Sequence, residues 1–182
     1  METIADLNKF KEMLRNSTKE QLIEIIVTKA ERDTSFELFV NSYLSSSENA
    51  DDVLKMFLKF CNRSRGKDEP DIDIIESGGN LFLEKMEGLS DSISKIKAYI
   101  LAANEIDDLI NEGAGMYNDD EWIITDIAKK CFDKVLEICT SAYASGDKDF
   151  LLEAKQLLDT IGISIGCTCL DKEVDKLFSI LN

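Results

Sequence analysis

Apolar residues recur at the spacing of one helix face along almost the whole chain, and the 182 residues contain a single proline. A spacing of three and four residues places side chains on one stripe of an α-helix, whereas a half-buried strand would alternate. Turns in sheet proteins draw heavily on proline and glycine. The pattern therefore predicts an all-α fold of eight or nine antiparallel helices, arranged as a bundle or a short α-solenoid.

Capping patterns and glycines divide this periodic sequence into segments. Ser17 and Glu20 have the spacing of a capping box, in which a hydroxyl and a carboxylate satisfy the first free amides of a helix. Gly78 and Gly79 predict a break, because each glycine inside a helix costs about 1 kcal/mol relative to alanine. The expected helices cover residues 3–15, 18–32, 50–63, 72–86 (with that break), 91–111, 121–144, 148–161 and 171–181, and one more begins at Asp33 or Thr34 and carries Tyr43.

The helical stripes also identify side chains that we expect to face the core. Phe10 lies on the stripe of the first helix, Ile23 and Ile26 lie on that of the second, and Tyr143 lies near the end of the segment 121–144. Residues 162–168 are rich in β-forming residues and fit a short extended piece, but the sequence offers no second strand to pair with them.

The least regular part of the chain is the polar stretch that contains the only proline. Residues 63–70 read Arg-Ser-Arg-Gly-Lys-Asp-Glu-Pro, a composition typical of an exposed loop. This stretch is the best candidate for a hinge. We therefore expect an N-terminal helical group over residues 1–64, an exposed loop or hinge over 65–70 and a C-terminal helical group over 71–182, with a single continuous domain as the alternative.

Charge limits the function more than any motif does. The chain has 36 acidic residues, 21 basic residues and no histidine, which gives a formal charge of −15. Residues 98–128 hold eight carboxylates and no lysine or arginine. Such a surface repels nucleic acid and anionic membranes and attracts basic partners. Without histidine, the usual general base near neutral pH and the Ser-His-Asp arrangement are both missing, so we expect no enzymatic activity and no catalytic residues.

No segment predicts a metal site, a cofactor site or a membrane span. The five cysteines are irregularly spaced and are expected to be reduced and free of metal. The acidic groups at 71–76 and 119–121 lack the spacing and central glycine of a calcium loop. No apolar run approaches the roughly 20 residues of a membrane span, and the acidic N-terminus lacks a signal-peptide core, so we expect a cytoplasmic protein without a cofactor.

Two stretches carry a resemblance to a known domain. Residues 18–26 (TKEQLIEII) followed by 29–33 (KAERD) resemble the opening helix of an α-helical repeat domain of poorly characterised bacterial proteins, some of which carry SWIM-type zinc fingers. Residues 99–147, with an acidic turn at 118–120, have a similar layout. The resemblance implies a helical-repeat fold that binds proteins. A SWIM finger uses Cys-x-Cys followed by Cys-x-His, whereas Cys167-Thr168-Cys169 stands alone here, so zinc-dependent nucleic-acid binding is not implied.

The acidic region around the 113–118 loop is the candidate partner-binding surface. Its members are Glu105, Asp107, Asp108, Glu112, Tyr117, Asp119, Asp120, Glu121 and Trp122. Trp122 has two interpretations: it packs into the core from the first turn of its helix, or it anchors a basic partner, as aromatic residues do at interface centres.

Two functional hypotheses follow from this surface. The first is a phage-type antagonist, such as an anti-CRISPR or anti-restriction protein, that presents a DNA-like row of carboxylates to a basic nucleic-acid-processing protein such as a nuclease. The alternative is a helical-repeat adaptor that binds a protein without mimicry. A mimic needs its carboxylates on one continuous surface, whereas an adaptor would scatter them and expose an apolar groove. The sequence does not reveal the oligomeric state.

Overall fold

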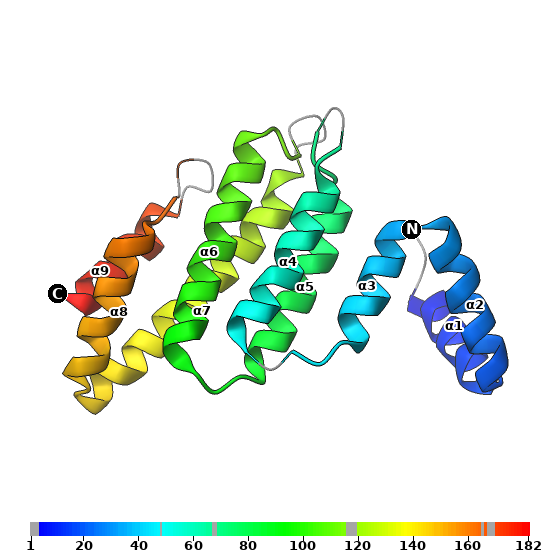
Figure 1. The fold of residues 1–182 in the computed structure, drawn as a ribbon, viewed down its shortest axis with the longest axis horizontal. Helices are drawn as coiled ribbons and strands as arrows, with labels where there is room; N and C mark the ends of the chain where they lie inside the picture. Colours follow the sequence, from blue (N-terminus) through cyan, green and yellow to red (C-terminus); the bar gives the residue numbers. More distant parts are fainter. Residues whose placement is uncertain (1–3, 48, 67–68, 116–119, 165, 167–169) are drawn as a thin grey trace. The chain divides into compact units, whose positions relative to one another are not determined.

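The computed structural model describes residues 4–47, 49–66, 69–115, 120–164, 166 and 170–182. Helices make up 82% of the described chain, and the described residues contain no strand beyond an isolated antiparallel bridge between Arg65 and Pro70. The all-α prediction is confirmed (Figure 1). The helices of the described chain are α1 (Ile4–Asn16), α2 (Lys19–Arg32), α3 (Thr34–Leu44), α4 (Ala50–Ser64), α5 (Ile72–Glu87), α6 (Ser92–Asn111), α7 (Glu121–Ser145), α8 (Lys148–Ile161) and α9 (Asp171–Leu181).

The chain forms two compact units, Met1–Asn41 and Ser42–Asn182. The loop 65–70, which was the expected hinge, lies inside the second unit. There it joins α4 to α5, and these two helices pack against each other. The amide of Asp71 donates to the carbonyl of Ser64 at 2.9 Å across the base of the loop, and Pro70 is buried. Both ends of this loop are therefore held by the fold.

The first unit contains α1, α2 and most of α3. The capping box at the start of α2 lies one residue later than predicted, because Thr18 is the N-cap. Its hydroxyl accepts from the amide of Gln21, and the Gln21 side chain accepts in turn from the amide of Thr18. The hydroxyl of Ser17 instead donates to the carbonyl of Met13.

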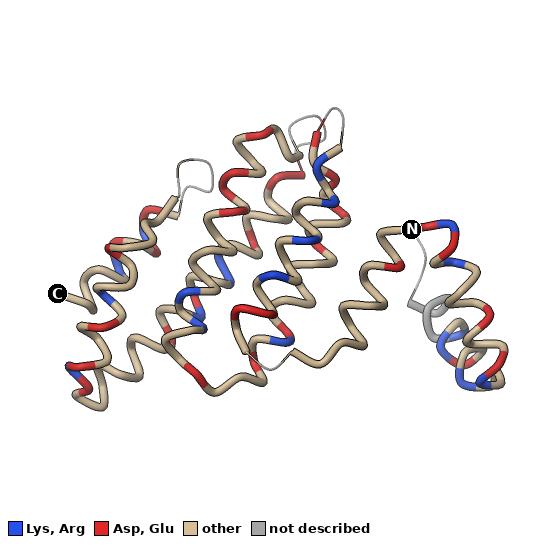
Figure 2. Tube along the Cα trace, in the orientation of Figure 1, with Lys and Arg blue, Asp and Glu red and all other residues tan. Residues whose placement is uncertain are grey.

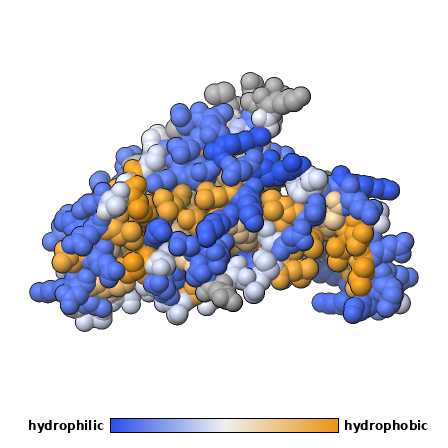
Figure 3. Space-filling model, in the orientation of Figure 1, coloured by the Kyte–Doolittle hydropathy of each residue, from blue (hydrophilic) through white to orange (hydrophobic). Residues whose placement is uncertain are grey.

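The apolar stripes of the first unit are exposed, contrary to the prediction for Phe10, Ile23 and Ile26. Phe10 is 50% exposed, and no residue of α2 is buried. In the space-filling view, hydrophobic residues reach the surface over the N-terminal helices (Figure 3). These helices are amphipathic as expected, but within their own unit they find too little partner surface to cover their apolar faces.

The second unit is a stack of three helical hairpins in two layers. Helix α4 packs on α5, α6 on α7 and α8 on α9, while α4, α6 and α8 follow one another in one layer and α5, α7 and α9 in the other. Each hairpin therefore makes its main contacts with its immediate neighbours, which is the layout of an α-solenoid.

The core of this unit lies between the two layers, along α4 to α7. Phe57, Phe82 and Tyr99 are fully buried and in ring contact, with centroids 5.3 and 5.8 Å apart and an edge-on geometry for the second pair. Tyr143, which the helical stripe placed in the core, is 65% exposed on the last turns of α7. The stripe fails there because the buried part of α7 ends at Cys139, and none of the residues from 140 to 145 is buried.

The glycine pair does not break α5, which runs without interruption from Ile72 to Glu87. Both glycines are buried, and each lies where another helix crosses. A Cβ on Gly78 would clash with the ring of Phe60 in α4, and one on Gly79 would lie 2.6 Å from Cδ1 of Ile127 in α7. The predicted break was wrong, because close packing on both sides compensates for the low helix propensity of glycine.

Candidate acidic partner-binding surface

The structure places the predicted site residues around the junction of α6 and α7. Glu105, Asp107 and Asp108 lie in the second half of α6, and Glu112 is its C-terminal cap. Asp120 precedes α7, and Glu121 and Trp122 form its first turn. Tyr117 and Asp119 lie outside the described residues.

The two helix ends are brought together by the backbone. Gly115 has a φ of +78°, and a Cβ at this position would overlap the amide of Glu121, so glycine is required here. The amide of Asp120 donates to the carbonyl of Gly115 at 3.3 Å. The start of α7 is therefore held directly beside the residues that follow α6.

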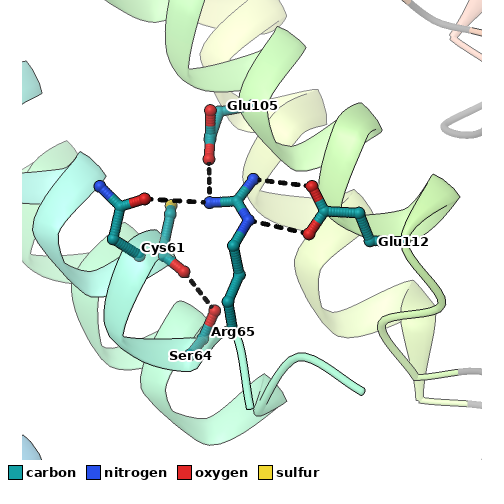
Figure 4. Close-up of polar contacts among 6 residues, drawn as sticks. Cys61, Ser64, Arg65, Glu105 and Glu112 are labelled. Carbon is teal, nitrogen blue, oxygen red and sulfur yellow. Dashed lines mark hydrogen bonds and ion pairs between the residues drawn. The ribbon is translucent and has the colours of Figure 1, made fainter. Parts of the chain in front are cut away.

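Two of the predicted carboxylates bind an arginine of the same chain (Figure 4). Arg65, just after α4, donates from Nη1 to Glu105 at 2.7 Å, and from Nε and Nη2 to the two oxygens of Glu112 at 2.8 and 3.0 Å. Glu105 and Glu112 lie seven residues apart on one face of α6, as the helix geometry predicts. We call Arg65, Glu105 and Glu112 the arginine clamp.

The clamp changes the local electrostatics in a simple way. Its carboxylates raise the pKa of Arg65 above its ordinary value, mainly through the paired hydrogen bonds to Glu112. The side chains of Arg65 and Glu105 are 30% and 21% exposed, so the pair is partly shielded from water. Arg65 therefore compensates one of the two negative charges of Glu105 and Glu112, and the clamp contributes a net charge of −1 to the external field instead of −2.

A third carboxylate, Asp107, has an internal role. It is buried, and one of its oxygens accepts from the hydroxyl of Ser164 at 2.6 Å. Asn104, one turn earlier, accepts from the amide of Ser164 and donates to the carbonyl of Gly162. Residues 162–164, the segment with β-rich composition, are thus irregular backbone anchored to α6.

The remaining described residues of the predicted surface face solvent. Asp108, Glu121 and Trp122 are exposed and Asp120 is half-buried. The Trp122 side chain is 66% exposed, which contradicts the interpretation of this residue as part of the core. We call Asp108, Asp120, Glu121 and Trp122 the junction rim.

Elsewhere in the second unit, basic residues neutralise many carboxylates, and Figure 2 shows acidic residues distributed along its helices with basic residues among them. Lys129 bonds Asp133 at 3.1 Å, and Lys130 bonds Asp126 at 2.7 Å. Acidic residues thus occur on every helix of this unit, with basic residues among them.

Metal binding and thiol chemistry find no support in the described part of the chain. No group of three or more acidic or cysteine side chains is placed there to hold a metal ion. Cys61, Cys131 and Cys139 are buried free thiols, and burial raises the pKa of each, so they stay protonated and are poor nucleophiles and ligands. None of the described helices is long and apolar enough to cross a bilayer.

Sequence reasoning missed Arg65, Asn104 and Ser164. The partners of Arg65 are 40 and 47 residues away, and Ser164 is 57 residues from Asp107. In the sequence, the only indication of the arginine clamp was that Glu105 and Glu112 lie on one face of a helix. This spacing does not indicate which basic residue binds them. Contacts at such separations follow from how the hairpins stack.

Comparisons of the chain with protein-family models, with curated proteins and with solved structures found no match. Fold and surface together define an all-α stack of helical hairpins with a strongly acidic second unit. The resemblance to a bacterial helical-repeat domain remains a prediction.

Proposed function

We propose that the protein is a non-enzymatic adaptor that binds a basic protein partner through the junction rim. The exposed indole of Trp122 carries this proposal. Tryptophan is among the residues most enriched in the energetically dominant centres of protein interfaces. Asp120 and Glu121 directly precede Trp122, so an arginine or lysine of the partner could stack on the indole ring while pairing with one of these carboxylates.

The shape of the second unit supports the adaptor. Stacked hairpins present an extended surface on which a partner contacts several helices at once. The unit Ser42–Asn182 carries 28 acidic and 15 basic residues, a net charge of −13, so a basic partner would be attracted from a distance before it docks.

Titration with an arginine-rich peptide tests the proposal directly. Trp122 is the only tryptophan, so its fluorescence reports on the junction rim alone. We expect the emission to change on binding and the affinity to fall as salt is added, because screening shortens the reach of the field.

A matched pair of variants separates the rim from net charge. Asp108→Asn with Asp120→Asn and Glu121→Gln removes three charges at the rim, and Asp149→Asn with Glu153→Gln and Asp159→Asn removes three from α8. With about 0.2–1 kcal/mol for each exposed pair, the rim variant should bind roughly tenfold more weakly in calorimetry, and the α8 variant should bind nearly as well as wild type. Equal losses in both variants would reject the rim as the binding site.

Nucleic-acid mimicry is the second candidate, and the charge of −13 on the second unit favours it. The arginine clamp and the internal bond of Asp107 reduce the row of carboxylates on which a mimic would depend. A mimic should displace duplex DNA from a basic DNA-binding protein in a band-shift assay, and the rim variant should fail to do so. Binding of the basic protein without displacement of DNA supports the adaptor alone.

A further inference from the structure

The hairpin of α1 and α2, residues 4–32, has apolar side chains on its surface that its own unit does not cover. Ile23, Ile25, Ile26 and Val27 of α2 are each between 41% and 52% exposed, and Met13 of α1 is 57% exposed. These residues span more than one face of α2, because Ile25 points about 100° or more away from Ile23, Ile26 and Val27 around the helix axis. A helix that is apolar over so much of its circumference is normally buried.

The same hairpin contains a shallow groove between its two helices. The groove has a volume of about 600 Å³, and it is lined by Met13 of α1, by Ser17 just after α1, and by Ile25 and Thr28 of α2. Glu24, Lys29 and Arg32 stand at its edges, so the apolar floor is bordered by charges of both signs. A surface of this kind can meet a copy of itself, as the isologous contact of a twofold dimer requires.

Charge indicates which part of a second molecule can approach. Residues 4–32 contain six basic and five acidic residues, a net charge of +1, whereas the rest of the chain has a net charge of −16. Two copies therefore repel one another strongly everywhere except at this hairpin.

The hairpin is large enough for a weak dimer. Helices of 13 and 14 residues are each roughly 20 Å long, and packed side by side they give a face roughly 20 Å across. In projection such a face has an area of roughly 400 Å², about half of the 800 Å² that each partner of a standard specific interface buries, so it suits only a weak association. We expect dissociation in the micromolar range.

We propose that the protein forms a homodimer through the α1–α2 hairpin, in which two hairpins pack face to face into a four-helix cluster. The proposed contact uses none of the residues of the junction rim.

Sedimentation velocity of the full chain over a roughly hundredfold range of concentration tests the dimer. We expect a shift from monomer to dimer in the micromolar range. We also expect added salt to leave the dimer intact or strengthen it, because screening reduces the repulsion between the acidic units. Binding of a basic partner should weaken with salt, so the two associations are told apart by the sign of this effect.

The variant Ile25→Gln with Ile26→Gln should raise the dissociation constant by roughly tenfold or more, since glutamine keeps the helix propensity but removes the apolar contact. The matched control is Tyr143→Gln with Leu152→Gln, which removes two equally exposed apolar residues from α7 and α8 and should leave the dimer unchanged. Circular dichroism confirms that both variants are folded.

Hydrogen exchange gives a readout that needs no variant. Amides of residues 9–32 should exchange more slowly at high protein concentration, and those of α6 and α7 should not change. A wild-type chain that stays monomeric over the whole range, or an equal loss of dimer in both variants, would overturn the proposal. A monomer whose hairpin amides are protected at every concentration would show that the chain covers this surface itself.

Discussion

Arg65 links the end of α4 to the second half of α6 through three short hydrogen bonds. A guanidinium that bonds one carboxylate through two parallel N–H groups is a strong and directional contact. Because Glu105 and Arg65 are partly shielded from water, the clamp contributes more than a typical surface ion pair, whose median value is near zero. It stabilises the fold, and the same interaction removes two carboxylates from the predicted binding surface.

Replacing Arg65 with methionine should lower the free energy of unfolding by about 1–2 kcal/mol, because the variant leaves Glu105 half-buried without its cation. Urea denaturation measures the loss. The control is Lys55→Met, which removes an exposed pair with Asp52 at 3.5 Å and should change stability by less than about 0.5 kcal/mol. Equal effects of the two substitutions would show the clamp to be an ordinary surface pair.

The buried thiols make the free energy of unfolding depend on pH in the alkaline range. Burial raises the pKa of Cys139 from the ordinary 9.0 to about 11, and it raises those of Cys61 and Cys131 further. The unfolded chain therefore loses these protons first as pH rises. Each thiol's contribution to the free energy of unfolding is fully present below about pH 9. It is lost as the pH rises through the pKa of the thiol in the folded chain, at up to about 1.4 kcal/mol per pH unit.

Urea denaturation at several pH values should show stability falling between about pH 9 and pH 11. In a Cys167→Ser, Cys169→Ser background, the three buried thiols should also react with a disulfide reagent only as fast as the chain opens. Rapid labelling of the native protein at neutral pH would contradict this prediction.

At the scale of the elements, α5 depends on its two glycines. Gly78→Ala gains about 1 kcal/mol of helix propensity but inserts a methyl group against the ring of Phe60, which costs about 1–3 kcal/mol. We therefore expect a net loss of about 1 kcal/mol, visible as a lower midpoint in thermal unfolding.

The rest of the same helix provides a graded comparison. Gly79→Ala should cost less, because it meets the flexible tip of Ile127. Gly88→Ala, at the end of α5, has an ordinary φ of −73° and only the Lys85 carbonyl within 4 Å, so it should be neutral or slightly stabilising. A stabilised Gly78→Ala variant would show that α4 and α5 are packed less closely than described.

Helix positions were predictable from the sequence, and helix partners were not. The boundaries of α8 and α9 agree with the predicted 148–161 and 171–181, because an apolar stripe marks each helix locally and Asp147 caps the start of α8. The capping box was displaced by one residue because Ser17 and Thr18 are chemically alike. The Gly78–Gly79 break failed for another reason: propensity is a local quantity, whereas the helices that cross there come from distant segments.

The candidate site shows the same limit. The sequence brought Glu105, Asp108 and Glu112 onto one face of a helix, and the structure agrees. It could not tell that Arg65 binds two of them, that Asp107 faces inward or that Trp122 faces out. The apolar stripe of a helix predicts which side of the helix faces the core on average. The exposure of a single side chain depends also on where the neighbouring helices end.

At the scale of the whole molecule, stability should differ between the two units. The described part of the first unit has no buried apolar residue, whereas the second unit buries a continuous core from α4 to α7. At low protein concentration, hydrogen exchange should be orders of magnitude faster in α2 than in α6 and α7. Comparable protection in α2 and α7 under these conditions would contradict this ranking.

Limited proteolysis gives a second view of the whole molecule. From its polar composition, we expect the loop 65–70 to be the first internal site of cleavage within the second unit. Initial cleavage inside α6 or α7 would contradict this expectation. The arginine clamp and the backbone hydrogen bond from Asp71 to Ser64 hold the ends of the loop. A protease should therefore cleave the Arg65→Met variant faster than the wild-type chain at the same site.

The stacking of the second unit also determines how it would respond to tension. Each hairpin contacts mainly its neighbours. Under a pulling force, the hairpins of such a stack should therefore detach one after another. Helices α8 and α9 bury only four residues between them, Ala154, Leu158, Leu177 and Leu181. A pull on the C-terminus would therefore peel this last pair away at low force and leave the four central helices intact, so the acidic unit could stretch without losing its core.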